Sequence, residues 1–218
     1  MAFFRPSGGM LYHWRAWRKR KDWGDFREQI ADWLGDFAGR QDELILIGPS
    51  GGYTLQTEWL KRFKKIHAYD LDPLAPLFFR ARHGRLPVAF HNQDLFWDEG
   101  RLSTVSLKTA LKKHPRAAVL ISNLLGQLLL EHPTDDRTWE IFLNRLRFTL
   151  KDREWASYHD LFTHERGEVI DHLTGGEWKA GLETRQFRWP LTATSLHIIE
   201  GLRSSGTPDS VSASPDAN

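Results

Sequence analysis

Three groups of residues suited to contacting a ribose and an adenine follow one another in the middle of the chain. The first is the run Gly48, Pro49, Ser50, Gly51 and Gly52, whose small side chains let a ligand approach the backbone. The second is Asp70, followed by Leu71, because a carboxylate there can accept hydrogen bonds from both ribose hydroxyl groups. The third is Asp94, followed by Leu95, whose carboxylate can accept from the exocyclic amine of adenine. Their order and spacing predict one nucleotide-type site.

Three other polar residues are candidates for catalysis. Asn123 ends an apolar run and can contact a substrate, although an asparagine that caps the next segment is an equal interpretation. His159 and Asp160 follow a predicted strand and can act as a base or position an acceptor, and an ordinary polar loop is the alternative. The ten histidines show no metal-ligand spacing such as His-Glu-x-x-His, so we predict no metal site.

Alternating strands and helices position these candidates. Apolar runs predict strands at residues 43–48, 66–70, 87–91, 117–123, 154–159, 184–189 and 195–200. Helices are predicted at 53–64, from near Pro73, around Leu107 and Leu111, at 135–150, and around residues 169–173. Such alternation predicts an α/β fold, with a doubly wound, mostly parallel seven-stranded sheet and helices on both faces. The link at residues 190–194 is too short for a parallel crossover, so the last two strands are expected to form an antiparallel hairpin.

The three groups and the sheet together resemble the class I S-adenosylmethionine-dependent methyltransferases, over roughly residues 40–200. In that family a glycine-rich loop follows the first strand, an acid ends the second, a polar or acidic residue follows the third, and the sheet finishes with an antiparallel strand. The resemblance implies S-adenosylmethionine as cofactor and direct in-line methyl transfer to an acceptor that the sequence does not identify. Ser50 stands where the family pattern has its middle glycine, and Leu46 where it often has an acid. The Asn-Pro-Pro-aromatic motif of methyltransferases that act on amino groups is absent, because Leu124 and Leu125 follow Asn123.

Two other functions stay open from the sequence. A catalytically silent methyltransferase-like domain would bind nucleic acid or a protein partner through a basic N-terminal segment. An NAD-dependent oxidoreductase would need the fingerprint Gly-x-Gly-x-x-Gly, but Tyr53 stands at its third glycine, where close packing of helix and strand is required.

Composition excludes several classes of protein. The chain has 218 residues, a formal net charge of +2 and no cysteine, which excludes disulfides, thiolate metal sites and a cysteine nucleophile. No apolar run is long enough for a membrane span, and the first residues lack a signal-peptide pattern. We therefore expect a soluble, cytoplasmic protein.

The sequence divides into three parts. Residues 1–40 predict a helical arm, first basic and then amphipathic; residues 41–203 predict the Rossmann-like domain; residues 204–218 predict a disordered tail. The arm carries six basic side chains before residue 22, no acid, and Trp14 and Trp17 among them. Such a stripe can bind nucleic acid or an anionic membrane surface. The alternative is that Tyr12, Trp14 and Trp17 dock a helix onto the domain.

Overall fold

The fold is known from a computed structural model, which describes residues 9–204 apart from residues 20, 166–167, 172–176 and 193–194. The predicted disordered tail lies outside the described residues, except for its first residue, Ser204. Within the described part, no helix is long and apolar enough to cross a membrane.

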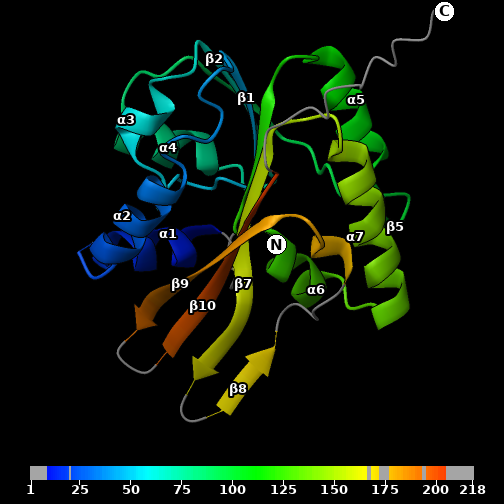
Figure 1. The fold of residues 1–218 in the computed structure, drawn as a ribbon. Helices are drawn as coiled ribbons and strands as arrows, with labels where there is room; N and C mark the ends of the chain where they lie inside the picture. Colours follow the sequence, from blue (N-terminus) through cyan, green and yellow to red (C-terminus); the bar gives the residue numbers. More distant parts are fainter. Residues whose placement is uncertain (1–8, 20, 166–167, 172–176, 193–194, 205–218) are drawn as a thin grey trace, which may run out of the picture.

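A central sheet organises the molecule (Figure 1). Its strands are β1 (Glu43–Ile47), β2 (Lys65–Tyr69), β3 (Val88–His91), β6 (Ala118–Ser122), β7 (Trp155–Glu165), β9 (Glu183–Thr192) and β10 (Ser195–Arg203), in the order β3-β2-β1-β6-β7-β10-β9. The first five strands are parallel, and β10 lies antiparallel between β7 and β9. The predicted fold class, including the terminal hairpin, is confirmed. The sheet has eight strands rather than the predicted seven, because β8 (Glu168–Asp171) also pairs with β7.

Helices cover both faces of the sheet (Figure 1). One face carries α1 (Gly9–Arg18), α2 (Gly24–Trp33), α3 (Thr57–Leu60) and α4 (Ala75–His83); the other carries α5 (Val105–Lys113), α6 (Leu125–Glu131) and α7 (Asp136–Leu150). The side chains of β1 show why helices pack on both faces of the sheet. Leu44 and Leu46 belong to one apolar cluster, whereas Ile45 and Ile47 belong to the other. Alternation of side chains along a strand therefore gives two cores, one on each side of the sheet.

The predicted helix at 53–64 is wrong in extent. Only Thr57–Leu60 is helical, and turns precede and follow that single helical turn. The side chains of Tyr53 and Thr54 are held in the interior, where they bond to His13 and Tyr158 respectively. These contacts keep the residues after Gly52 out of a helix. The N–H groups of Gly48, Ser50 and Gly52 are themselves bonded, to Tyr69, Asp70 and Pro49 respectively. The glycine-rich run therefore meets a ligand through close approach to its backbone, and no helix N-terminus follows it directly.

The predicted helix around residues 169–173 is also wrong. Strand β8 (Glu168–Asp171) occupies part of this segment and pairs with the end of β7, which runs to Glu165. Strand β7 is longer than predicted because β10 pairs with it over almost its whole length. His159 and Asp160 therefore lie inside β7, and the prediction that they follow a strand is wrong. A further two-residue pair, β4 (Trp97–Asp98) with β5 (Arg101–Leu102), was not predicted.

The N-terminal helix α1 docks through residues other than those expected. His13 and Ala16 are buried and Tyr12 is half-buried, whereas Trp14 and Trp17 are 55% and 61% exposed. The interpretation that both tryptophans dock this helix is therefore wrong. The amphipathic part behaves as predicted, since Phe26, Ile30 and Trp33 of α2 are all buried.

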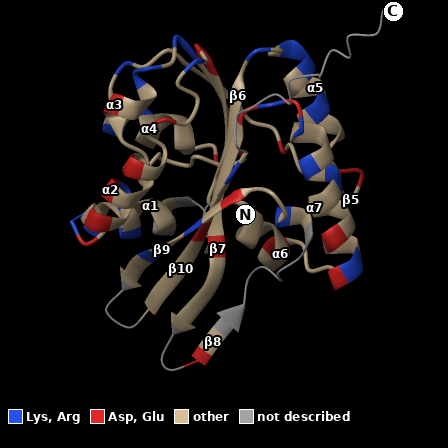
Figure 2. Cartoon of the chain, viewed as in Figure 1, with Lys and Arg blue, Asp and Glu red and all other residues tan. Residues whose placement is uncertain are grey.

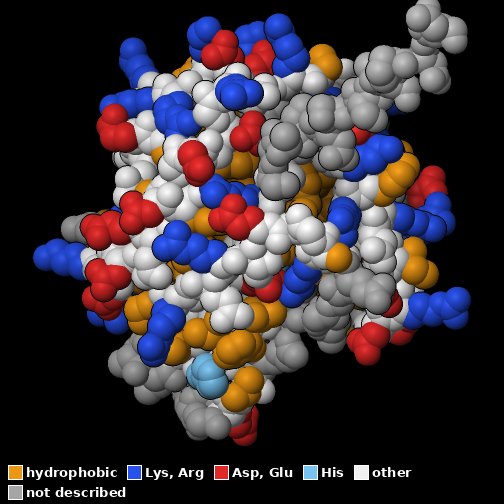
Figure 3. Space-filling view, viewed as in Figure 1, with side chains coloured by type: hydrophobic (Ala, Val, Ile, Leu, Met, Phe, Trp, Pro, Cys, Tyr) orange, Lys and Arg blue, Asp and Glu red, His pale blue; other side chains and the backbone are white. Residues whose placement is uncertain are grey.

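Charged residues lie mainly on the helices and at the ends of strands, while the central strands are nearly free of charge along most of their length (Figure 2). Basic and acidic side chains are interspersed on the face seen in Figure 3, and apolar side chains gather at the level of β9 and β10.

Candidate ligand-binding pocket

A cavity of about 310 Å³ opens where β1, β2, β3 and β6 end. Four carboxylates line it, from Asp70, Asp72, Asp94 and Glu131, and no Lys, Arg or His side chain is among the described residues of its wall. Parallel strands bring their carboxyl ends to one edge, so the polar residues that follow β1, β2, β3 and β6 meet there. The resulting electrostatic potential favours a cationic ligand.

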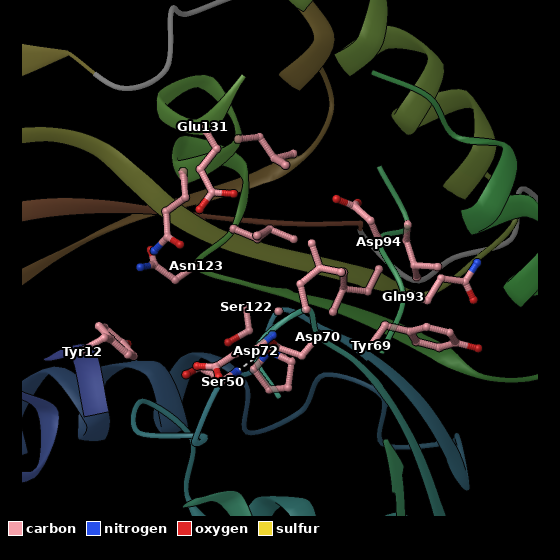
Figure 4. Close-up of a pocket in the computed structure, with 18 of the residues that line it drawn as sticks. Tyr12, Ser50, Tyr69, Asp70, Asp72, Gln93, Asp94, Ser122, Asn123 and Glu131 are labelled. Atoms are coloured by element: carbon pink, nitrogen blue, oxygen red, sulfur yellow. Dashed lines mark hydrogen bonds between the residues drawn. The ribbon is translucent and has the colours of Figure 1, made fainter. Parts of the chain in front are cut away.

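Asp70 and Ser50 form the middle of the pocket (Figure 4). The Ser50 N–H donates to Asp70 Oδ2 at 2.6 Å, and the Asp72 N–H donates to Asp70 Oδ1 at 2.8 Å. Burial raises the pKa of Asp70 to about 6, although both hydrogen bonds act in the opposite direction. Asp70 is thus tied to the glycine-rich run and is ionised only above mildly acidic pH.

The glycine-rich run turns sharply at this point. Gly48, Ser50 and Gly52 all have positive φ, of 67°, 48° and 66°. Gly52 has no room for a side chain, because a Cβ there would lie 2.5 Å from His83 Nε2. Ser50 adopts the left-handed conformation despite its side chain, which costs roughly 1–2 kcal/mol relative to glycine.

Asp94, Gln93 and Tyr69 lie at one end of the pocket (Figure 4). Asp94 Oδ1 accepts from the backbone N–H groups of Phe96 (2.7 Å) and Trp97 (3.0 Å), which fixes the turn after β3. Both bonds use Oδ1, so Oδ2 can accept a hydrogen bond from a ligand. The buried Leu95 also lines this end.

Tyr12, Asn123 and Glu131 lie at the opposite end (Figure 4). Asn123 follows β6 with φ of 50°, and its N–H donates to the Tyr158 carbonyl at 2.7 Å. Asn123 Oδ1 is buried and has no hydrogen-bond partner among the described residues. A buried carbonyl oxygen of this kind needs a donor, which a ligand can provide.

His13 holds Tyr12 and helix α1 against the pocket. Its Nε2–H donates to Asp72 Oδ2 at 2.9 Å, its Nδ1 contacts the Tyr53 hydroxyl at 2.7 Å, and its ring stacks on Phe78. Burial raises the pKa of Tyr53 above its ordinary value, so its hydroxyl stays protonated at neutral pH. Helix α1 therefore forms part of the pocket.

A chain of buried hydroxyl groups lies under the same region. Tyr158 contacts both Thr54 Oγ1 (2.5 Å) and Ser122 Oγ through its hydroxyl. Burial raises the pKa of Tyr158 to about 12, so this group is a hydrogen-bond donor and not a base at neutral pH.

The pocket brings together most of the predicted site residues. Its wall includes Gly48, Pro49, Ser50, Asp70, Leu71, Asp94, Leu95 and Asn123. Gly51 and Gly52 shape the turn but are not in the wall.

The two remaining predicted residues lie elsewhere on β7. His159 is fully buried, 3.4 Å from Glu200, which itself pairs with Lys179 at 2.6 Å. Asp160 accepts from His197 Nδ1 at 2.5 Å. Neither is part of the pocket wall, and the prediction that they are catalytic stays a prediction.

Sequence reasoning missed Tyr12, Tyr53, Asp72, Gln93 and Glu131. Glu131 had a detectable pattern, since it follows Gln127 by four residues on α6 and so shares its face. No pattern in the sequence points to Tyr12, because only the docking of α1 brings it to the pocket.

No family model and no curated protein matches the sequence. A solved structure of a S-adenosylmethionine-dependent methyltransferase from Anabaena variabilis matches with a TM-score of 0.51 and 12% identity, covering 94% of this chain and 98% of that one. The chain has the class I methyltransferase fold.

Further structures with a methyltransferase fold are similar at lower scores. The N-methyltransferase NodS from Bradyrhizobium japonicum has a TM-score of 0.47 and 13% identity, covering 83% of this chain and 97% of that one. Magnesium protoporphyrin IX methyltransferase from Synechocystis, with bound S-adenosylmethionine, has a TM-score of 0.47 and 14% identity, covering 90% of this chain and 86% of that one. At these identities the likeness concerns the methyltransferase fold alone.

Proposed function

We propose that this chain is a S-adenosylmethionine-dependent methyltransferase that acts by direct in-line transfer. The observation that carries the proposal is the pocket itself. Residues after β1, β2 and β3 line one cavity in the order glycine-rich run, Asp70, Asp94, and its charged side chains are all acidic among the described residues of its wall. This charge suits a sulfonium cation.

The pocket residues divide between the parts of the proposed cofactor. Asp94 and Leu95 would contact the adenine, Asp70 and Leu71 the ribose, and the run Gly48–Gly52 the remaining portion through close approach to its backbone. S-adenosylmethionine, when bound, supplies an electrophilic methyl group. Asn123 and Tyr12 lie at the end opposite Asp94, where we place the acceptor.

At that end, positioning is the main contribution of the chain. Holding the acceptor atom in line with the methyl group lowers the barrier by avoiding loss of orientational freedom in the transition state. Asn123 Oδ1 would accept a hydrogen bond from the acceptor, since it has no partner among the described residues. His159 and Asp160 are not needed for this step.

Calorimetric titration tests the proposal. S-adenosylhomocysteine is expected to bind at one site, and NAD is expected to give no binding heat. Asp70→Ala should weaken the binding at least about tenfold, because hydrogen bonds to a charged group contribute about 1.5–3 kcal/mol. Asp42→Ala is the control, since Asp42 is exposed and pairs only with Lys64 at 2.7 Å among the described residues.

Two results would contradict the proposal. Folded protein that binds NAD but not S-adenosylhomocysteine would support the oxidoreductase instead. Unchanged affinity in the Asp70→Ala variant would show that the ribose lies elsewhere. Tyr53 already argues against the oxidoreductase, because it is 8% exposed and packs its ring where that fingerprint has glycine.

A further inference from the structure

A second polar cluster lies on the sheet, apart from the pocket. Glu43 is the first residue of β1, His67 is in the middle of β2, and His114 follows the last residue of α5. Each of the three offers one ligand atom, and these atoms all lie within 4.8 Å of one another. The pocket begins beyond the opposite, carboxyl end of β1, so the two sites share no residue.

The register of the sheet explains why these residues meet. His67 pairs with Ile45, which faces the same apolar cluster as helix α5. Glu43 is two residues before Ile45 and shares its face, and the end of α5 places His114 over both strands. The rings of His67 and His114 stack with centroids 3.5 Å apart.

Two observations indicate that the cluster lacks a partner. His67 Nε2 is buried and makes no hydrogen bond within the described part of the chain. Glu43 is approached only loosely by a cation, because Lys65 Nζ is 3.6 Å from its Oε1. A buried nitrogen with a lone pair or proton left unsatisfied costs free energy unless something binds it.

We propose that Glu43, His67 and His114 bind one divalent transition-metal ion of the zinc type. Two imidazoles and one carboxylate are a donor set that suits Zn²⁺ and neighbouring ions, and it does not suit Mg²⁺ or Ca²⁺, which prefer oxygen. Three protein ligands leave a fourth position for water. The bound ion would turn the stacked rings of His67 and His114 until one nitrogen of each points at it, since an imidazole coordinates in its ring plane. It would then link β1, β2 and the end of α5, and would displace Lys65 from Glu43.

The sequence predicts no metal site because these ligands are far apart in the chain and show no local spacing. Only the parallel pairing of β1 with β2 and the packing of α5 bring them together. The proposal does not depend on the activity assigned to the pocket.

The test uses the full chain, freed of any affinity tag and of metal by a chelator that is then removed. Calorimetric titration with ZnCl₂ is expected to show saturable binding of one equivalent, and CoCl₂ is expected to give visible absorption bands typical of a four- or five-coordinate site. His67→Ala and His114→Ala should each weaken Zn²⁺ binding by at least about tenfold, because even loss of an outer partner costs that much.

His132→Ala is the matched control. His132 is also half-buried and also stacks on an aromatic ring, that of Trp97, but it is not part of the cluster. The affinity of the His132→Ala variant for Zn²⁺ should equal that of the unchanged chain. Circular dichroism shows whether each variant is folded. If His67→Ala does not fold, the Glu43→Gln variant is used in its place.

Absence of saturable Zn²⁺ binding would overturn the proposal. Binding that is equally strong in the His114→Ala and Glu43→Gln variants would also overturn it, because the ion would then be adventitious or held elsewhere.

Discussion

Asp70 must be ionised to accept both ribose hydroxyl groups, yet its burial favours the neutral form. Its pKa is raised to about 6, so a fall in pH from 7 to 5 protonates it. Binding of S-adenosylhomocysteine should therefore weaken below pH 6, approaching tenfold per pH unit. Calorimetric titration at several pH values measures this slope.

The Asp70→Asn variant is the control for that slope. It carries no titratable group at this position, so its weaker affinity should vary much less between pH 7 and pH 5. If the affinity of the unchanged chain for S-adenosylhomocysteine stays constant between pH 7 and pH 5, Asp70 does not contact the ligand as a carboxylate.

At the scale of elements, the turn after β1 depends on the contact between Gly52 and helix α4. A Cβ at Gly52 would lie 2.5 Å from His83 and 2.9 Å from Phe79, and the residue also has positive φ. Gly84 has a similar φ of 70° but open space around it. Gly84 has ψ of −148°, a conformation that only glycine adopts readily, so Gly84→Ala should cost the backbone strain alone, about 1–3 kcal/mol. Gly52→Ala should cost more, because it adds the clash with α4, and it should weaken ligand binding. Urea denaturation and calorimetry compare the two variants; equal losses would contradict the packing argument.

Neutral His83 connects the same turn to α4 by hydrogen bonds. Its Nε2–H donates to the Gly52 carbonyl at 3.1 Å, and its Nδ1 contacts Thr57 Oγ1 at 2.8 Å. Burial lowers its pKa from 6.5 to about 4. His83 is therefore protonated more easily in the unfolded chain than in the folded one. The contribution of neutral His83 to the free energy of unfolding is complete above pH 6.5 and is lost as the pH falls toward 4.

This linkage predicts a measurable loss. Between pH 7 and pH 5 the free energy of unfolding should fall by about 2 kcal/mol more in the unchanged chain than in His83→Gln. Urea denaturation at both pH values gives the difference. Parallel slopes for the two proteins would show that His83 does not stay neutral in the fold.

At the scale of the molecule, the sequence predicts the fold well because the sheet depends on local patterns. The apolar runs of β1 and β6 predict buried strands, and the short link between β9 and β10 predicts their antiparallel pairing, whereas the strand order comes from the structure. Sequence reasoning fails where distant side chains decide local structure. Tyr158 and His13 hold Thr54 and Tyr53 away from a helix, and pairing with β10 lengthens β7 past Asp160.

The docking of α1 is the largest such long-range effect, because it brings Tyr12 to the pocket through His13. His13→Ala removes the bonds to Asp72 and Tyr53 and the stack on Phe78. It should therefore free α1, increase proteolytic cleavage near the N-terminus and weaken S-adenosylhomocysteine binding. Trp14→Ala, on the exposed side of the same helix, should leave both unchanged. If His13→Ala keeps full protection and full affinity, α1 is not part of the binding site, and the pocket is complete without it.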